Sequence, residues 1–188
     1  MRKTSLLLIA ALVTSLAACS INVKKGENGE EKQVDINTPA GGIHINKDAE
    51  AADTGIAVYP GAQLRPDQDD KNGNRANINL SGFGFGMKVV ALDYTSDDSP
   101  AKIQKFYESQ LGKYGKVLAC HTNEMHVDLG HDDKSGSNEL NCGDSKGPNV
   151  ELKVGKKDEQ HIVSIKPSGK GAEFSLVYIR MHGKDSDI

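Results

Sequence analysis

Apolar and polar residues alternate with a period of two in several short segments of this chain. Strict alternation is typical of β-strands that bury one face. The segments are residues 21–24, 33–37 and 43–46 near the N-terminus, and 150–154, 161–166 and 174–180 in the C-terminal third. Turns rich in glycine and lysine separate the last three, so the sequence predicts an antiparallel meander at the C-terminus.

A longer strand is predicted over residues 77–94, which end in a nearly continuous apolar run. Its middle carries Gly82, Gly84 and Gly86, at every second position. These glycines would leave one face of the strand without side chains while aromatic residues cover the other, which permits a close backbone approach or a flexible tongue. Further strands are expected at residues 116–120 and 125–129, where the same alternation recurs.

A single amphipathic helix is predicted to begin at residue 100. Ser99 can cap free backbone amides, and Pro100 suits the first helical position. Apolar residues then recur at helical spacing, namely Ile103, Phe106, Tyr107 and Leu111. Together these patterns predict an α+β fold, in which a mostly antiparallel sheet of five to seven strands packs against one amphipathic helix. The N-terminal strands would form an extended β arm.

The first eighteen residues have the organisation of a secretory signal peptide. Arg2 and Lys3 give a basic start, an apolar run follows, and small residues lead to Cys19. The apolar run is shorter than the ~18 residues that a transmembrane helix needs. Removing this segment would leave an ordinary secreted protein with an odd cysteine, or a protein held at a membrane by that cysteine.

The segment Leu-Ala-Ala-Cys at residues 16–19 resembles the lipobox of bacterial lipoproteins. The resemblance implies cleavage before Cys19 and acylation of its thiol, for example with palmitate, so that the mature chain is anchored to a lipid bilayer. Ser20 follows, where an aspartate tends to retain Gram-negative lipoproteins in the inner membrane. We therefore expect a protein of the bacterial cell envelope, anchored in the outer membrane with its domain in the periplasm.

This reasoning predicts three parts of the chain. They are a signal peptide over residues 1–18, a lipid-anchored arm and linker over 19–55, and a single α+β domain over 56–188. The linker, residues 47–55, is Ala-rich and acidic, and predicts an irregular segment or one helical turn. The net formal charge of −3 gives no reason to expect a nucleic-acid partner.

Cys120 and Cys142 are the two cysteines left after Cys19. An exported location is oxidising, so the sequence predicts an intrachain disulfide between them. The alternative is a pair of thiolate metal ligands or a redox pair, but the spacing is unlike Cys-x-x-Cys.

The chain also resembles a group of uncharacterised bacterial lipoproteins. The likeness rests on the segment YPGA at residues 59–62, on SDDSP at 96–100 and the Phe-Tyr that follows it, and on VDINTPAGG at 34–42. It implies an envelope lipoprotein, and it carries no known activity and no catalytic residues. Function has to be argued from the sites themselves.

One cluster of residues has the donor types that zinc or copper prefer. Its members are His121, His126, Asp128 and His131, followed by two more aspartates. Steps of five residues place successive histidines on opposite faces of a strand, so only a folded loop could bring them together. The alternative is a set of surface histidines on a strand and turn. The acidic loop at residues 67–74 lacks the spacing of a calcium-binding EF-hand loop.

Two short matches to serine enzymes have simpler explanations. Gly-Asp-Ser-Lys-Gly at residues 143–147 fits the Gly-x-Ser-x-Gly of hydrolases, but a proline and a predicted strand follow it instead of a helix. Ser99 and Lys102 match Ser-x-x-Lys, but a helix cap explains that serine. The leading hypothesis is therefore a non-enzymatic envelope protein, without a cofactor, that binds another envelope protein or supports assembly. The alternatives are a metal- or small-ligand-binding module and a hydrolase that uses Ser145.

Overall fold

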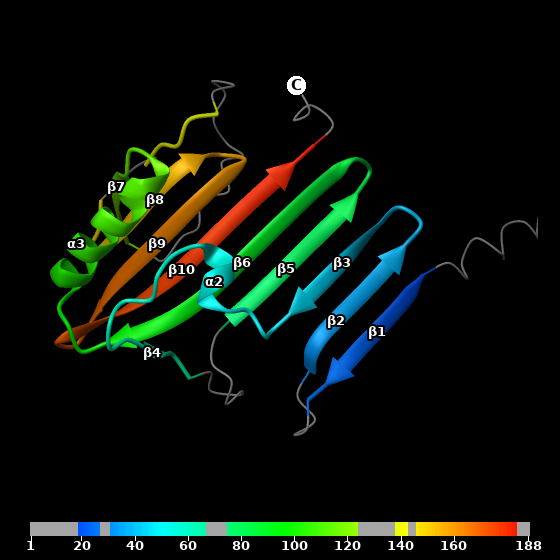
Figure 1. The fold of residues 1–188 in the computed structure, drawn as a ribbon, viewed down its shortest axis with the longest axis horizontal. Coiled ribbons are helices and arrows are strands. Elements are labelled where there is room, and N and C mark those ends of the chain that lie inside the picture. The colour runs from blue at the N-terminus through cyan, green and yellow to red at the C-terminus, as the bar shows by residue number, and fades with distance from the viewer. Residues whose placement is uncertain (1–18, 27–30, 67–74, 124–137, 143–145, 184–188) are drawn as a thin grey trace, which may run out of the picture.

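A single antiparallel sheet organises the molecule (Figure 1). The computed structural model describes residues 19–26, 31–66, 75–123, 138–142 and 146–183. In these residues ten strands pair in the order β1-β2-β3-β5-β6-β10-β9-β8-β7, with β4 attached to β6. The prediction of an α+β fold with a mostly antiparallel sheet is confirmed. No helix in the described part of the chain is long and apolar enough to cross a bilayer.

The bounds of the elements follow the alternation of the sequence closely. The strands are β1 (Ser20–Lys25), β2 (Glu31–Thr38), β3 (Gly41–Asn46), β4 (Gln63–Leu64), β5 (Arg75–Gly82), β6 (Phe85–Ser96), β7 (Leu118–Thr122), β8 (Asn149–Lys156), β9 (Glu159–Ser168) and β10 (Gly171–His182). The helices are α2 (Ala51–Thr54) and α3 (Pro100–Leu111), and the short 3-10 turn η2 (Gly112–Tyr114) follows α3.

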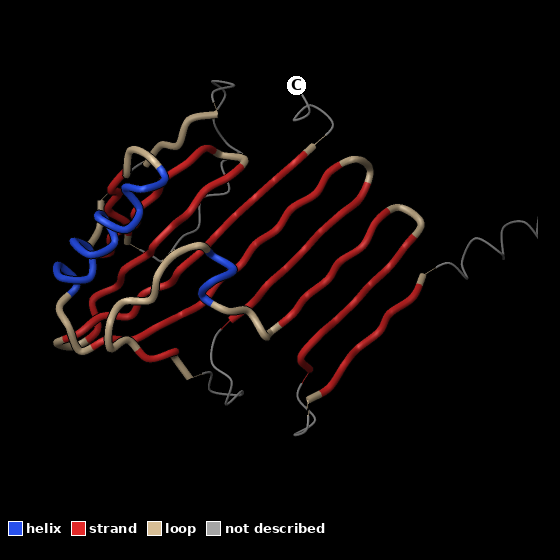
Figure 2. Tube along the Cα trace, viewed as in Figure 1, coloured by secondary structure: helices blue, strands red, loops and turns tan. Residues whose placement is uncertain are grey.

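The predicted N-terminal arm does consist of strands, but these strands continue the main sheet. β1 pairs with β2, β2 with β3, and β3 with β5, all antiparallel. Because the arm joins the sheet in this way, the sheet has ten strands and not the expected five to seven. Figure 2 shows the resulting continuous layer, with both helices on one of its faces.

The expectation of one strand over residues 77–94 is wrong. The chain turns back on itself between β5 and β6, where Gly82 pairs with Phe85 and the two residues between them form the turn. Phe83 has a φ of 53° and Gly84 a φ of 81°. Two successive residues in the left-handed region are the requirement of the tight turn that matches the twist of a hairpin. A phenylalanine at the first of these positions concealed the turn.

Helix α3 is confirmed, and it covers the main core. Ile103, Tyr107 and Leu111 are fully buried on its inner side, where the helix packs against β8 and β9. The ring of Tyr107 tilts against that of Phe174 on β10. The hydroxyl of Tyr107 accepts a hydrogen bond from the backbone amide of Tyr59, at 3.0 Å. The helix and the segment that leads to β4 are thereby joined over the same core.

The connection between β3 and β4 contains α2, a single turn where a linker or one helical turn was expected. α2 packs against β6 and β10. Gly55 ends it with a φ of 68°, in the left-handed conformation that closes many helices. The backbone oxygen of Thr54 lies 2.9 Å from Nδ1 of His161, so this turn is fastened to β9.

The predicted disulfide is present between Cys120 and Cys142, whose Cα atoms are 5.2 Å apart. Cys120 lies in β7 and is buried, while Cys142 belongs to the segment 138–142. The bond therefore attaches this segment to the strand at the far edge of the sheet.

Candidate interaction surface

Two rows of apolar side chains cross six neighbouring strands on the face of the sheet opposite α3. Residues that pair directly in antiparallel strands point to the same face, so the register defines each row. One row consists of Val23, Val34, Ile45, Ile78, Val89 and Ile179, and the other of Ile21, Ile36, Ile43, Leu80, Met87 and Met181. We call these twelve residues the apolar face.

Much of the apolar face is accessible. Ile21 is 71% exposed, Val23 40% and Ile43 36%. Among the described elements, the extensive contacts of β1, β2, β3 and β5 are with neighbouring strands of the same sheet. At the other end of the rows Ile179 is buried, and with Ile162 and Val177 it forms a second, smaller core. The face is therefore covered toward β9 and open toward β1.

The size of the apolar face follows from sheet geometry. Without the covered end on β10, five strands about 4.8 Å apart and two rows about 7 Å apart give a flat area of roughly 340 Å². The largest apolar patch of a monomeric protein is typically about 300–600 Å², and such patches are often functional. No member of the two rows is charged. The area and the composition both fit a surface that binds another molecule.

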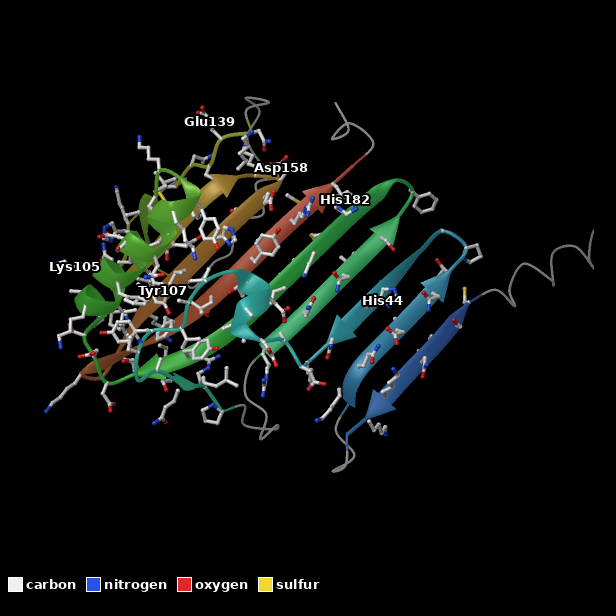
Figure 3. The ribbon with its side chains drawn as sticks, viewed as in Figure 1. His44, Lys105, Tyr107, Glu139, Asp158 and His182 are labelled. Carbon is white, nitrogen blue, oxygen red and sulfur yellow. A yellow bond between two sulfur atoms is a disulfide. The ribbon has the colours of Figure 1, made fainter. Side chains whose placement is uncertain are left out.

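The opposite face of β1, β2, β3 and β5 is polar, whereas on β6 and β10 it carries the main core. A register row there joins Asn22, Asp35, His44, Asn79 and Lys88. Nδ1 of His44 lies 2.8 Å from Oδ1 of Asp35, and this hydrogen bond holds the pKa of the Asp35 carboxyl below its usual range. Figure 3 labels His44 on this face. The two faces of these strands therefore differ in chemistry, one aliphatic and the other polar.

The outer edge of β1 is less suited to pairing with a further strand. The strand ends in Lys24 and Lys25, and its pairing with β2 shifts register between these two residues. Edge lysines and irregular pairing are devices that keep sheet edges from joining other strands. In this part of the molecule the apolar face is therefore better suited than the edge of β1 to contact another molecule.

The residues of the predicted metal cluster are mostly outside the described residues. His121 lies in β7 with an exposed side chain, whereas His126, Asp128 and His131 fall in the undescribed range 124–137. The acidic loop at 67–74 and Ser145 also lie outside the described residues. Within the described part of the chain, no three His, Cys, Asp or Glu side chains are grouped to hold a metal ion.

The Ser-x-x-Lys match lies at the start of α3, where its lysine forms a local ion pair. Nζ of Lys102 is 2.7 Å from Asp98, one helical turn away. The hydroxyl of Tyr59 donates a second hydrogen bond to Asp98, at 2.8 Å. Both bonds favour the ionised carboxylate, so the pKa of Asp98 is lowered. Ser99 occupies the N-cap position as predicted, but its hydroxyl makes no capping hydrogen bond. Only its backbone oxygen accepts hydrogen bonds from the first turn, from the amides of Lys102 and Ile103.

His161 is the half-buried histidine of the described core, and its neighbours hold it in place. Its ring stacks on Tyr114, with the centroids 3.8 Å apart, while Nδ1 contacts the oxygen of Thr54. Burial lowers its pKa. These are the contacts of a packing residue, because one joins η2 to the sheet and the other joins α2 to the sheet.

Cys19, the predicted lipidation site, is exposed and directly precedes β1. The structure therefore leaves its thiol accessible at the start of the strand that borders the apolar face. Comparison with family models, with characterised proteins and with solved structures finds no match for this chain.

Sequence reasoning did not find the apolar face, although its signal is present. Apolar and polar residues alternate along each of the strands β1, β2, β3 and β5. Every residue that these strands contribute to the two rows is uncharged and apolar. The rows can be recognised only when the register aligns the apolar phases of all the strands.

Proposed function

We propose that this chain is a non-enzymatic lipoprotein of the bacterial envelope, and that its apolar face binds another protein. The observation that carries the proposal is the uncharged double row of aliphatic side chains on six paired strands, open toward β1. Aliphatic side chains on a sheet face are what a second packed layer normally covers. A partner protein would supply that layer.

The composition of the face favours a protein over a small ligand. A small ligand usually needs a concave site with a few convergent polar groups, whereas the apolar face is a sheet surface of Ile, Val, Leu and Met. Covering roughly 340 Å² at about 25 cal/mol per Å² yields about 8 kcal/mol from this side of the interface. Association costs about 4–15 kcal/mol, so the fit between the two surfaces would decide the affinity.

The anchor supports the same proposal. Acyl chains on Cys19 would hold the protein at a membrane. We propose that this is the outer membrane and that the sheet lies in the periplasm. Proteins confined to one membrane meet at a raised effective concentration, so an interface of modest affinity is sufficient. The partners we propose are thus the lipid bilayer, through Cys19, and a protein of the envelope, through the apolar face.

A pair of neighbouring substitutions tests the role of the face. Ile43→Lys places a charge in the middle of the apolar face, whereas His44→Lys places the same charge on the polar face, beside Asp35. Both variants, and the unaltered chain, are crosslinked in the native envelope, and the captured complex is quantified. We expect Ile43→Lys to remove the complex and His44→Lys to retain it. Equal effects of the two variants would refute the proposal.

A further inference from the structure

Three exposed segments meet at one end of the sheet. Cys19 directly precedes β1, and Ser20 pairs with Asn37 next to the β2–β3 turn. Gly41, which follows that turn, pairs with Gly82 next to the β5–β6 turn. The start of β1 and both turns therefore lie side by side along one margin of the sheet, as Figure 1 shows. We call this margin the tip.

Phe83 is the most prominent residue of the tip. Its side chain is 89% exposed, and its φ of 53° lies in the left-handed region that L-residues with bulky side chains rarely adopt. Hairpin turns of this kind prefer asparagine, aspartate or glycine. A phenylalanine at this position destabilises the turn, and its ring is not buried against the described residues. Contact with something outside the chain explains why the position carries an aromatic ring.

The tip is also free of charge over its whole width. Residues 19–23, 37–43 and 80–87 contain no charged side chain, and Phe85, 46% exposed, adds a second aromatic ring. Lys88 and Arg180 lie opposite each other in the register of β6 and β10, behind the tip. Exposed aromatic residues ahead of basic ones are typical of surfaces that enter the interface of a lipid bilayer.

We propose that the tip contacts the lipid bilayer and that Phe83 enters its interfacial region. The inference rests on the proposed function in one respect, because an acylated Cys19 would hold this same end of the sheet at the membrane surface. No described spacer separates Cys19 from β1. The strands then rise away from the membrane, and the apolar face is turned sideways, toward other proteins in the same membrane.

Tryptophan fluorescence tests this contact directly, because the chain contains no tryptophan. Phe83→Trp and, separately, Lys170→Trp are introduced into the full chain, which is purified from membranes and reconstituted into vesicles whose lipids carry brominated acyl chains. Lys170 lies in the turn that precedes β10, and the twelve residues of β10 place it about 37 Å from the tip. Bromine quenches a tryptophan only at short range.

We expect the fluorescence of Phe83→Trp to be quenched at least severalfold more strongly than that of Lys170→Trp, with its emission shifted to the blue. Equal quenching of the two would overturn the inference. Phe85→Trp gives a second reporter at the tip if Phe83→Trp fails to fold, which its melting temperature reveals. It should be quenched to an intermediate extent because Phe85 is less exposed than Phe83.

The mass of the same purified protein separates this inference from the proposed anchor. Acylated Cys19 together with an unquenched tryptophan at position 83 overturns the tip contact and leaves the anchor in place. Quenching in a chain whose Cys19 carries no acyl group supports the contact and removes the anchor.

Discussion

Replacing Phe83 by asparagine should make the protein more stable. The side chain of Phe83 is 89% exposed, so its removal sacrifices almost no buried area. The left-handed conformation costs an ordinary L-residue about 1–2 kcal/mol, and asparagine is one of the few that tolerate it. Gly84, with a φ of 81°, would complete an Asn-Gly pair, the strongest hairpin turn signal. We therefore expect Phe83→Asn to raise the free energy of unfolding by about 1 kcal/mol.

Urea-induced unfolding measures this change, and Phe83→Ala is the matched control. Alanine also removes the ring but keeps the strain of the left-handed backbone, so its stability should stay close to that of the unaltered chain. For a chain of this size, about 1 kcal/mol corresponds to a rise in melting temperature of about 2–4 °C. The reasoning fails if Phe83→Asn is no more stable than Phe83→Ala. A gain would show that Phe83 lowers the stability of the hairpin in which it lies.

Three other predictions concern the core. Replacing Cys120 and Cys142 together by serine should lower the free energy of unfolding by about 3 kcal/mol, since the bond joins positions 22 residues apart; unchanged unfolding in urea would contradict this. Tyr107→Phe should cost about 1 kcal/mol, because the partly buried amide of Tyr59 loses its acceptor, and thermal unfolding that matches the unaltered chain would count against it. Burial lowers the pKa of His161 below its ordinary 6.5, so the unfolded chain binds the proton first. The stability that depends on neutral His161 should therefore be fully present above pH 6.5 and decline as the pH falls below it. His161→Gln should weaken this decline in urea titrations at successive pH values.

Local patterns of the sequence were sufficient to predict the strands of both ends and helix α3. The period-two segments became β1, β2, β3, β8, β9 and β10. Ile103, Tyr107 and Leu111 are buried as their helical spacing requires. The disulfide followed from the number of cysteines and from the expectation of an oxidising, exported location. Each of these features is determined by interactions between residues close in the sequence or by a single covalent bond.

The features that the sequence did not reveal depend on pairing between distant strands. That β3 pairs with β5, and so merges the arm with the main sheet, is a tertiary fact that no local pattern states. The turn at Phe83 was missed because the residue opposes the conformation that it adopts. For this reason neither candidate surface could be predicted. The apolar face can be recognised only from the register between the strands, and the tip only from the turn between β5 and β6.

The central claim is that the sheet recognises a protein partner with its apolar face, and one crosslinking measurement tests it most directly. A photoreactive amino acid is placed at Val23 or at Asn22, neighbours on β1 that point to opposite faces of the sheet. The protein is then illuminated in its native envelope. Our account predicts one defined protein adduct from position 23 and none from position 22. Adducts from both positions alike, or from neither, would contradict it.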